Sequence, residues 1–481
     1  MISTYPVISG KYLINGEWKE IRETANVINP ANMSEIVGEV ALCSKGIVNE
    51  AIEAAEKAYN TWSRSDVKDR STLMNKAAEK LANIIEENVT LFVRENGKTL
   101  VEAKKDLLRC VEIMKGGAAE LPNWWKPEVL TGTQKVQIRR RARGITAVIT
   151  PWNSPMILTF KRVIPAILAG NTVVIKPATN CPLTIMSCLK VVAEYFPPGV
   201  INIVTGSGKV IGDTLCSDSR VRTVAFVGST TTGKDIMKNS AENLQKVYME
   251  LGGNDPAIIL EDANLDEEAI KRLKMGILRA AGQVCSAIKR VYVHKSRYDE
   301  VVKKLTKEFE RVVVGDGIQP DVTMGPLNNK VQFDYVNELI ERTARSGAEV
   351  VTAGIQLNPE TWDKGYYMLP SIVTGVSQQS EVVQDEQFGP IIPVLPFTTI
   401  DEAIKLANDS QFGLRASVWT ENEELAIEMA DRLEAGAVFH NNHTIFNDLA
   451  LDFPGLKESG VSRETRHCGL EFFTDSYGFA N

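Results

Sequence analysis

The sequence predicts an α/β protein built on parallel, doubly wound sheets. Between residues 144 and 228, short runs of β-branched residues alternate with helical patterns. These runs lie at 145–150, 171–177, 200–204 and 221–227. A similar alternation runs over residues 256–442. Buried strands that alternate with helices are typical of parallel sheets, whose ligands bind beyond the carboxyl ends of the strands. The 481 residues are enough for two or three domains.

The composition is that of an ordinary globular protein, with 44% hydrophobic and 24% charged residues. The formal net charge of -7 argues against nucleic acid as a partner. The longest apolar stretch, residues 155–175, contains Lys161 and Arg162, so we do not expect it to span a membrane. The first residues show no basic region followed by an apolar run, so no signal peptide is expected.

Cysteine and histidine usage indicates a reducing environment. The seven cysteines are scattered without a Cys-x-x-Cys pair, and none of the four histidines lies in a metal-binding motif. We therefore expect a cytoplasmic protein with no metal site and no serine–histidine–aspartate triad.

The first quarter of the chain is predicted to be mainly helical. Asn15-Gly16 lies between two short strand-like runs and predicts a hairpin. Ser44 is expected to cap a helix rich in alanine, and further helical patterns cover 68–85 and 99–114. Gly and Pro at 116–122 are expected to end the last of these helices.

Residues 129–143 predict an exposed strand pair, because polar and apolar side chains alternate over 135–139. Five basic residues lie in this segment: Lys135, Arg139, Arg140, Arg141 and Arg143. Either these side chains are solvated, or the strands pair with another copy of the chain through an exposed edge.

Two glycine-rich loops resemble phosphate-binding motifs. The first, Gly206-x-Gly208-x-x-x-Gly212, lacks the third glycine at the spacing of the dinucleotide fingerprint. The second, 228–234, fits the glycine and lysine positions of a nucleoside-triphosphate loop, but Asp235 follows where magnesium binding needs Ser or Thr. An ATPase is therefore disfavoured, although a loop that enters a helix remains a suitable anion site.

Cys285 and Glu250 are the candidates for chemistry. Cys285 lies among small residues next to Gly282, and Glu250 precedes the turn Gly252-Gly253. A thiol nucleophile with a carboxylate base could attack a carbonyl group. Free cysteines are more often buried and inert, and the spacing alone leaves both interpretations open.

Eight short motifs follow one another along the chain. They lie at 151–155, 169–177, 226–229, 250–254, 282–285, 324–326, 386–390 and 412–414. Their composition and order resemble the NAD(P)-dependent aldehyde dehydrogenase superfamily over nearly the whole chain. The resemblance implies a Rossmann-type cofactor domain (1–124 and 144–252), an α/β catalytic domain (253–450) and a small β oligomerisation element (125–143 and 466–481). It also implies a homodimer or homotetramer that acts on a small-molecule aldehyde.

By this resemblance Cys285 is the nucleophile that forms a thiohemiacetal, and then a thioester, with the substrate. Asn153 and the Cys285 backbone N–H stabilise the oxyanion, and Glu250 activates water for hydrolysis. The cofactor is NAD or NADP, because Thr179 stands where strongly NAD-selective relatives often have Glu. The residues expected to bind it are Ile149, Thr150, Pro151, Trp152, Lys176, Ala178, Thr179, Gly208, Gly212, Phe226, Gly228, Ser229, Leu251, Gly252, Glu386 and Phe388.

The substrate pocket is expected to depart from the common family pattern. Ser154 replaces an aromatic residue, and Lys161 stands where many relatives have Trp. Either Lys161 faces the tunnel and favours a semialdehyde or aromatic aldehyde with a polar or anionic far end, or it is a surface lysine on its helix. Pro454 replaces a glycine in the loop 443–460 at the expected entrance. The residues assigned to the pocket are Ser154, Lys161, Val284, Ser286 and Asn442. Two alternatives remain, a CoA-acylating dehydrogenase and a cofactor-free thiol hydrolase.

Overall fold

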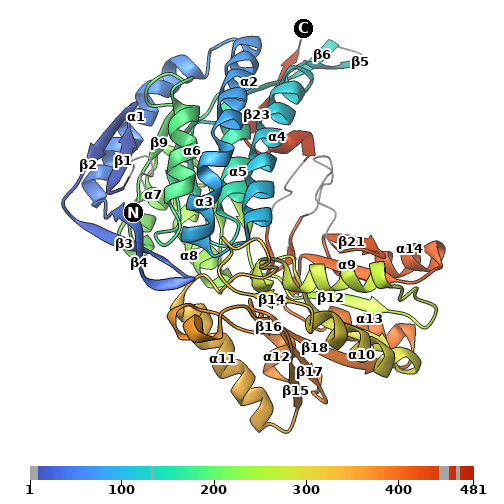
Figure 1. Ribbon diagram of the computed structural model, residues 1–481. Helices are drawn as coiled ribbons and strands as arrows, with labels where there is room; N and C mark the ends of the chain where they lie inside the picture. The colour runs from blue at the N-terminus through green and yellow to red at the C-terminus, as the bar shows by residue number, and fades with distance from the viewer. Residues whose placement is uncertain (1–8, 132–134, 444–453, 462–465, 481) are drawn as a thin grey trace.

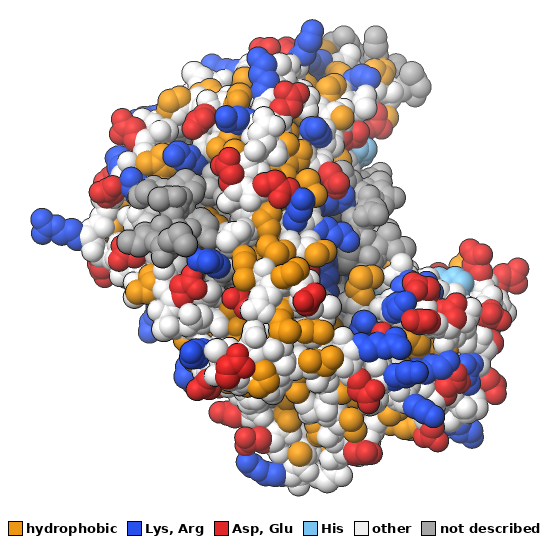
Figure 2. All heavy atoms as spheres, viewed as in Figure 1, with side chains coloured by type: hydrophobic (Ala, Val, Ile, Leu, Met, Phe, Trp, Pro, Cys, Tyr) orange, Lys and Arg blue, Asp and Glu red, His pale blue; other side chains and the backbone are white. Residues whose placement is uncertain are grey.

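Two seven-stranded sheets organise the chain, one in the upper and one in the lower part of Figure 1. The computed structural model describes residues 9–131, 135–443, 454–461 and 466–480. The α/β class predicted from the sequence is confirmed, because mainly parallel strands alternate with helices in both parts. Within the described ranges, no helix has the length and apolar character needed to cross a membrane. On the face in Figure 2, basic side chains lie among acidic ones over both parts.

The first sheet has the order β11-β10-β7-β8-β9-β1-β2. Its strands are β1 (Lys11–Ile14), β2 (Glu17–Glu20), β7 (Ile145–Ile149), β8 (Thr172–Lys176), β9 (Ile201–Ile203), β10 (Val221–Val227) and β11 (Lys246–Glu250). Strands β7 to β11 are parallel, and the hairpin β1–β2 adds to β9 in the antiparallel sense. The strand order reverses between β7 and β10, and open α/β sheets bind their ligands at such a point.

Helices cover both faces of this sheet. They are α1 (Lys45–Trp62), α2 (Val67–Asn83), α3 (Ile85–Asn96), α4 (Leu100–Trp124), α5 (Pro155–Leu168), α6 (Leu183–Ala193), α7 (Asp213–Ser217) and α8 (Thr230–Ala241). Along β8, Val173 and Ile175 pack into the core shared with α2, α4, α5 and α6. Val174 points to the opposite face and packs with α1, α7 and α8. This alternation explains why β8 is apolar at consecutive positions.

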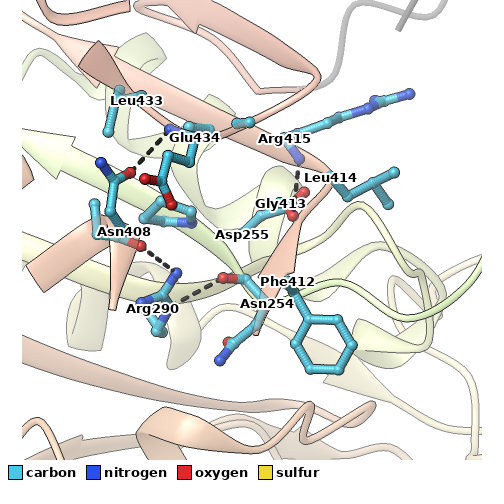
Figure 3. Close-up of a pocket in the computed structure, with 14 residues that line it drawn as sticks. Asn254, Asp255, Arg290, Asn408, Phe412, Gly413, Leu414, Arg415, Leu433 and Glu434 are labelled. Atoms are coloured by element: carbon cyan, nitrogen blue, oxygen red, sulfur yellow. Dashed lines mark hydrogen bonds between the residues drawn. The ribbon is translucent and has the colours of Figure 1, made fainter. Parts of the chain in front are cut away.

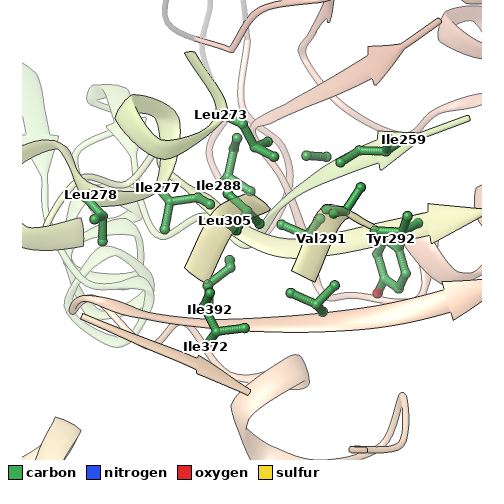
Figure 4. Packing of buried hydrophobic residues seen from close by; sticks show 14 of the residues in the cluster. Ile259, Leu273, Ile277, Leu278, Ile288, Val291, Tyr292, Leu305, Ile372 and Ile392 are labelled. Atoms are coloured by element: carbon green, nitrogen blue, oxygen red, sulfur yellow. The ribbon is translucent and has the colours of Figure 1, made fainter. Parts of the chain in front are cut away.

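The second sheet has the order β15-β17-β18-β13-β12-β20-β21, and only β15 runs antiparallel to its neighbour. Its strands are β12 (Asp255–Ile259), β13 (Ile288–His294), β15 (Glu349–Thr352), β17 (Ser371–Thr374), β18 (Ile391–Phe397), β20 (Arg415–Trp419) and β21 (Ala437–His440). Its helices are α9 (Glu267–Leu278), α10 (Tyr298–Phe309), α11 (Lys330–Arg345), α12 (Glu381–Gln384), α13 (Ile400–Asn408) and α14 (Glu423–Arg432). Figure 4 shows Leu273 and Ile277 of α9 facing Ile288 and Val291 of β13 in the core of this part.

Smaller β elements complete the fold. They are β3 (Thr24–Asn29) with β4 (Asn32–Ala41), β5 (Glu128–Thr131) with β6 (Lys135–Ala142) and β23 (Thr474–Ala480), β14 (Val313–Val314) with β16 (Ile355–Gln356), and β19 (Phe412–Gly413) with β22 (Leu456–Lys457). The predicted strand pair at 129–143 is therefore confirmed as β5–β6, and the C-terminal strand β23 adds to it. This three-stranded sheet lies at the upper end of the view in Figure 1.

Local predictions in the first quarter were partly right. Asn15 and Gly16 have φ of 54° and 78°, as a tight hairpin requires, and the Ser44 side chain caps α1. The prediction that glycine and proline end the third helix before residue 122 is wrong, because α4 continues to Trp124. A Cβ at Gly117 would lie 2.8 Å from Leu168 Cδ1, so this glycine permits close packing against α5. The hairpin β3–β4 and the helix α3 were not predicted.

Candidate active site

A cavity of about 250 Å³ lies at the carboxyl ends of β7, β10 and β11, where the first sheet meets loops of the second part. It is lined by Pro151, Trp152, Asn153, Val227, Gly228, Ser229, Leu251, Gly252, Cys285, Gln332, Glu386 and Phe388. The cavity therefore combines the reversal point of the first sheet with the cysteine singled out in the sequence. This is the place where an α/β sheet binds a ligand.

Cys285 follows a turn with an unusual backbone. Ala280, Ala281 and Gly282 have φ of 49°, 55° and 75°, in the left-handed region that alanine rarely adopts. A Cβ at Gly282 would lie 2.2 Å from the Gly389 carbonyl oxygen, so only glycine fits there. Backbone strain of this kind persists only where the surroundings hold it in place.

Side chains from both parts of the molecule hold this turn. The Ala280 N–H donates to Glu102 Oε1 at 2.8 Å, and Glu102 Oε2 also completes the capping box at the start of α4. On the other side, the ammonium of Lys289 donates to the Gly282 carbonyl. The turn is thus held by a carboxylate at one end and an ammonium at the other.

The thiol of Cys285 lies next to Glu250. The Sγ–Oε1 distance is 3.5 Å, and Glu250 Oε2 accepts a hydrogen bond from Arg162, which is 1% exposed. Burial raises the pKa of the Cys285 thiol well above its ordinary value, and the nearby Glu250 carboxylate acts in the same direction. The resting thiol is therefore protonated, and a base must remove its proton before it can act as a nucleophile.

Asn153 follows β7 and is buried against the same loop. Its Nδ2 donates to the Gln283 carbonyl at 3.0 Å, two residues before Cys285. The three residues predicted for catalysis, which are 97 and 35 positions apart in the sequence (250 − 153 and 285 − 250), are therefore brought to one place.

The predicted cofactor residues fall into two groups. Pro151, Trp152, Gly228, Ser229, Leu251, Gly252, Glu386 and Phe388 line the cavity with Cys285. Ile149 and Phe226 are paired at the ends of β7 and β10 just behind it, and Thr150 bonds Thr159. Ser229 also caps α8, whose N-terminus is directed toward the cavity wall.

The second group lies outside the cavity, around the carboxyl ends of β8 and β9. It comprises Lys176, Ala178, Thr179, Gly208 and Gly212. The Thr179 hydroxyl donates to the Gly206 carbonyl at 3.1 Å, and Gly208–Gly212 forms a π-helical turn. Burial lowers the pKa of Lys176 to about 8.

Glu386 lies between the two parts of the molecule. Its Oε1 accepts a hydrogen bond from the Gly253 N–H at 3.0 Å, and burial raises its pKa to about 7. Phe388 has φ of 46° and packs edge-on against Trp152, with ring centroids 5.6 Å apart.

None of the residues predicted for the substrate pocket lines the cavity. Ser154, Val284 and Ser286 are buried beside Asn153 and Cys285, whereas Lys161 is half-buried on α5. Asn442 accepts a hydrogen bond from the His443 N–H at 2.7 Å. Most of the loop predicted to form the entrance, 444–453, is outside the described residues.

Sequence reasoning missed Gln332, Arg162 and Lys289. Gln332 lines the cavity from α11, where nothing in the local sequence distinguishes it. In the sequence, Arg162 is one of two charges within an apolar stretch. That charge was itself a signal, because a buried arginine needs an acidic partner, which here is Glu250. Within the described ranges, no group of three or more His, Cys, Asp or Glu could hold a metal ion.

A comparison with protein families agrees with this geometry. The model described as "Aldehyde dehydrogenase family" matches residues 18–477. The chain belongs to the aldehyde dehydrogenase family. An aldehyde dehydrogenase of Davidiella tassiana is 38% identical and covers 97% of this chain and 95% of its own. The α-ketoglutaric semialdehyde dehydrogenase of Bacillus subtilis is 35% identical, with 96% of each chain covered.

Solved aldehyde dehydrogenases share the architecture. The betaine aldehyde dehydrogenase of Staphylococcus aureus in complex with NAD+ is 30% identical, with a TM-score of 0.94 over 99% of this chain and 95% of its own. The lactaldehyde dehydrogenase of Escherichia coli gives a TM-score of 0.93 at 30% identity, over 98% and 99% of the two chains. The resemblance inferred from eight short motifs is therefore confirmed at the level of the family and the fold.

Proposed function

We propose that this aldehyde dehydrogenase oxidises an aldehyde to a free carboxylic acid with NAD or NADP. The observation that carries the proposal is the 3.5 Å approach of Cys285 Sγ to Glu250 Oε1 within the cavity at the sheet reversal. A nucleophile with an adjacent carboxylate base is the arrangement that covalent carbonyl chemistry requires.

In the first step Glu250 takes the thiol proton, and Cys285 Sγ forms a bond to the aldehyde carbon. The raised pKa of the Cys285 thiol makes this assistance necessary. The carbonyl oxygen becomes an oxyanion that needs hydrogen-bond donors. Asn153 gives one amide N–H to the Gln283 carbonyl, which fixes the side chain and leaves the second N–H available for the oxyanion.

The residues around the cavity suit a dinucleotide. Ser229 and the N-terminus of α8 offer N–H and hydroxyl donors for a pyrophosphate, and buried Lys176 offers an ammonium for the adenosine ribose. Glu386, held by the Gly253 N–H, offers an acceptor for the second ribose. When bound, an oxidised nicotinamide would supply the hydride acceptor that conversion of the Cys285 thiohemiacetal to a thioester needs.

Glu250 first passes the thiol proton to solvent and then takes a proton from a water molecule that attacks the thioester carbon. The C–S bond breaks, and the departing Cys285 thiolate takes up that proton as the acid is released. Arg162 supports this role, because its buried guanidinium keeps one carboxylate oxygen fixed while the other faces the thiol. A base that is placed to activate water favours hydrolysis of the thioester over transfer of the acyl group to CoA. A cofactor-free thiol hydrolase is less well supported, since no histidine is among the residues that line the cavity.

The main test follows reduced-nicotinamide absorbance with a panel of aldehydes and either cofactor. Cys285→Ala is expected to abolish turnover. Glu250→Gln is expected to stop steady-state turnover. A retained burst of one cofactor reduced per site would assign Glu250 to hydrolysis alone, and loss of the burst would show that it also takes the thiol proton. Full steady-state activity of Cys285→Ala would overturn the mechanism, and CoA-dependent turnover of the wild type would redirect it.

We propose further that Lys161 selects an aldehyde with an anionic or polar far end. Lys161 is half-buried on α5, seven residues after Ser154 (161 − 154) at the start of that helix. The B. subtilis relative is named for a semialdehyde, which carries a carboxylate at the end away from its aldehyde group, and this supports such a substrate. The ratio of kcat/KM for a semialdehyde acid to that for its uncharged analogue is expected to fall in Lys161→Ala. An unchanged ratio would exclude this role.

The remaining proposals concern organisation. We infer the domain division stated above, with the β5–β6–β23 sheet as the contact between copies of a homodimer or homotetramer. Its exposed Val129, Leu130 and Phe479 support such a contact. Phe479→Lys is expected to lower the mass measured by light scattering. The free state of all seven cysteines supports a cytoplasmic location.

A further inference from the structure

Lys289 is a buried lysine beneath the nucleophile, and the mechanism above does not use it. It is the second residue of β13, four positions after Cys285 (289 − 285), and is 1% exposed. Its ammonium donates to the Gly282 carbonyl and lies 5.3 Å from the centroid of the Phe388 ring. Its side chain therefore connects the turn before Cys285 with the loop that carries Glu386 and Phe388.

The charged groups that face Lys289 are mainly acidic. Burial lowers the pKa of Lys289 to about 8, whereas Glu386, Asp255 and the Cys285 thiolate act in the opposite direction. Burial also raises the pKa of Glu386, and Lys289 is the group that lowers that pKa most. A cation buried this completely needs nearby negative charge.

The groups around the Cys285 thiol explain why a cation is needed there. Three carboxylates, from Glu250 on β11, Glu386 before β18 and Asp255 on β12, all disfavour a thiolate, and Arg415 on β20 favours it. Asp255 also accepts from the Arg415 backbone N–H at 3.1 Å, the contact drawn in Figure 3, and lies 3.4 Å from His443 Nε2.

The other buried cation of β13 serves a different purpose. Arg290 donates to the carbonyls of Asn254, Leu406 and Ala407, which hold loops of the second part together. Figure 3 shows its contact with Asn254, on the side of Asp255 away from Arg415. The guanidinium of Arg290 thus donates to backbone carbonyls, whereas the ammonium of Lys289 lies near the titratable groups Cys285, Glu386 and Asp255.

We propose that Lys289 is a positioning residue for Cys285: its ammonium holds the Gly282 carbonyl and offsets the surrounding carboxylates, so that the thiolate can form. The inference rests on the proposed function, since it assigns Cys285 as the nucleophile. Lys289 is not among the residues that line the cavity with Cys285, although its ammonium contacts the ring of Phe388, which is. It therefore acts on Cys285 through its charge and through the Gly282 carbonyl.

The experiment measures the rate at which iodoacetamide alkylates Cys285 between pH 6 and 10, by peptide mass spectrometry, without cofactor or aldehyde. Lys289→Met removes the charge and the donor, whereas Lys289→Gln keeps a donor for the Gly282 carbonyl. At each pH below the pKa of the Cys285 thiol, we expect both variants to react on the order of tenfold more slowly than the wild type. This is the loss of thiolate that follows when the pKa of Cys285 rises by about one unit.

Lys274→Met is the matched control. It removes the same charge from a partly exposed ion pair with Glu308, at 2.9 Å on the neighbouring helix α10, and is expected to leave the alkylation profile unchanged. Circular dichroism and the Tm establish that each variant is folded. If Lys289→Met does not fold, Lys289→Gln carries the test.

Three results would overturn the proposal. Folded Lys289 variants could react at the wild-type rate, Lys289→Gln alone could restore that rate, or neither variant could fold. The last two would assign Lys289 a structural role through its hydrogen bond. These outcomes differ from a failure of the proposed function, which would appear as steady-state aldehyde oxidation by Cys285→Ala whatever the Lys289 variants do.

Discussion

Two buried lysines, one in each sheet, show how the surroundings of a charge decide its use. Lys176 ends β8 in the first sheet and is 6% exposed, and Lys289 is the second residue of β13 in the second sheet and is 1% exposed. Burial lowers the pKa of each to about 8. Lys289 faces Glu386, Asp255 and Cys285, whereas among the described residues the effect of burial on the pKa of Lys176 is opposed by one thiol, Cys216. A buried ammonium beside which the described residues place no carboxylate, such as that of Lys176, is suited to bind a ligand. One that lies among carboxylates, such as that of Lys289, is suited to balance their charge.

The largest effect is expected on cofactor affinity. Lys176→Met is expected to weaken NADP or NAD binding about 10- to 100-fold, because a hydrogen bond from a charged group contributes about 1.5–3 kcal/mol. Lys289→Met is expected to change cofactor affinity by less than about threefold, because the charge of Lys289 is balanced by carboxylates of the protein itself. Quenching of protein fluorescence by the cofactor measures both. Equal losses in the two variants would remove the distinction between the lysines.

The pH dependence of binding sharpens the comparison. The pKa of Lys176 is about 8, so its ammonium is charged below that pH and loses its proton as the pH rises through it. Cofactor affinity is therefore expected to be steady from pH 6 to 7 and to fall between pH 7.5 and 9, more for NADP, which carries the extra phosphate. Lys176→Met should give a flat profile over this range. A decline that persists in Lys176→Met would assign the titration to another group.

Thr179→Glu would give Lys176 an internal acid similar to those around Lys289. Thr179 follows β8 by three residues (179 − 176), and its hydroxyl donates to the Gly206 carbonyl at 3.1 Å. The new carboxylate is expected to repel a 2′-phosphate and to lower NADP affinity on the order of tenfold relative to NAD. Thr179→Gln, equal in size but uncharged, is the control and should not discriminate. Parallel changes in both cofactors would show that Thr179 lies away from the phosphate.

The smallest effect is expected at the far end of the nucleophile turn. Glu102 accepts from the Ala280 N–H, whereas Lys289 supports Gly282. Glu102→Gln retains only one oxygen acceptor for the capping box and the turn, which is expected to cost about 1 kcal/mol of stability. We expect two- to threefold slower alkylation of Cys285, without the pH shift predicted for Lys289 variants. A pH shift in Glu102→Gln would mean that geometry alone controls the thiol.

The sequence predicted those features that depend on local pattern. β7, β8 and β10 were predicted because strands buried on both faces are continuously apolar. β11 was missed, since Lys246 and Glu250 begin and end it with charges. The length of α4 was missed because a glycine that normally ends a helix here permits contact with α5.

Prediction of the site depended on the family resemblance and not on spacing. Cys285, Glu250 and Asn153 were assigned roles by their motifs, and the structure brings them together. Lys289 was not singled out, because its burial is created by residues near 253–255 and 386–388, which are distant in the sequence. No local pattern distinguishes it from a solvated lysine at the start of a strand.

The close backbone contacts around Cys285 limit how this enzyme can diverge. A Cβ at Gly253 would lie 2.1 Å from the Cys285 carbonyl oxygen, and one at Gly282 would lie 2.2 Å from that of Gly389. A side chain can rotate to relieve a clash, but a carbonyl oxygen in a fixed loop cannot. Three loops must therefore change together or not at all. A single substitution at Gly253 or Gly282 is therefore not expected to be accepted on its own.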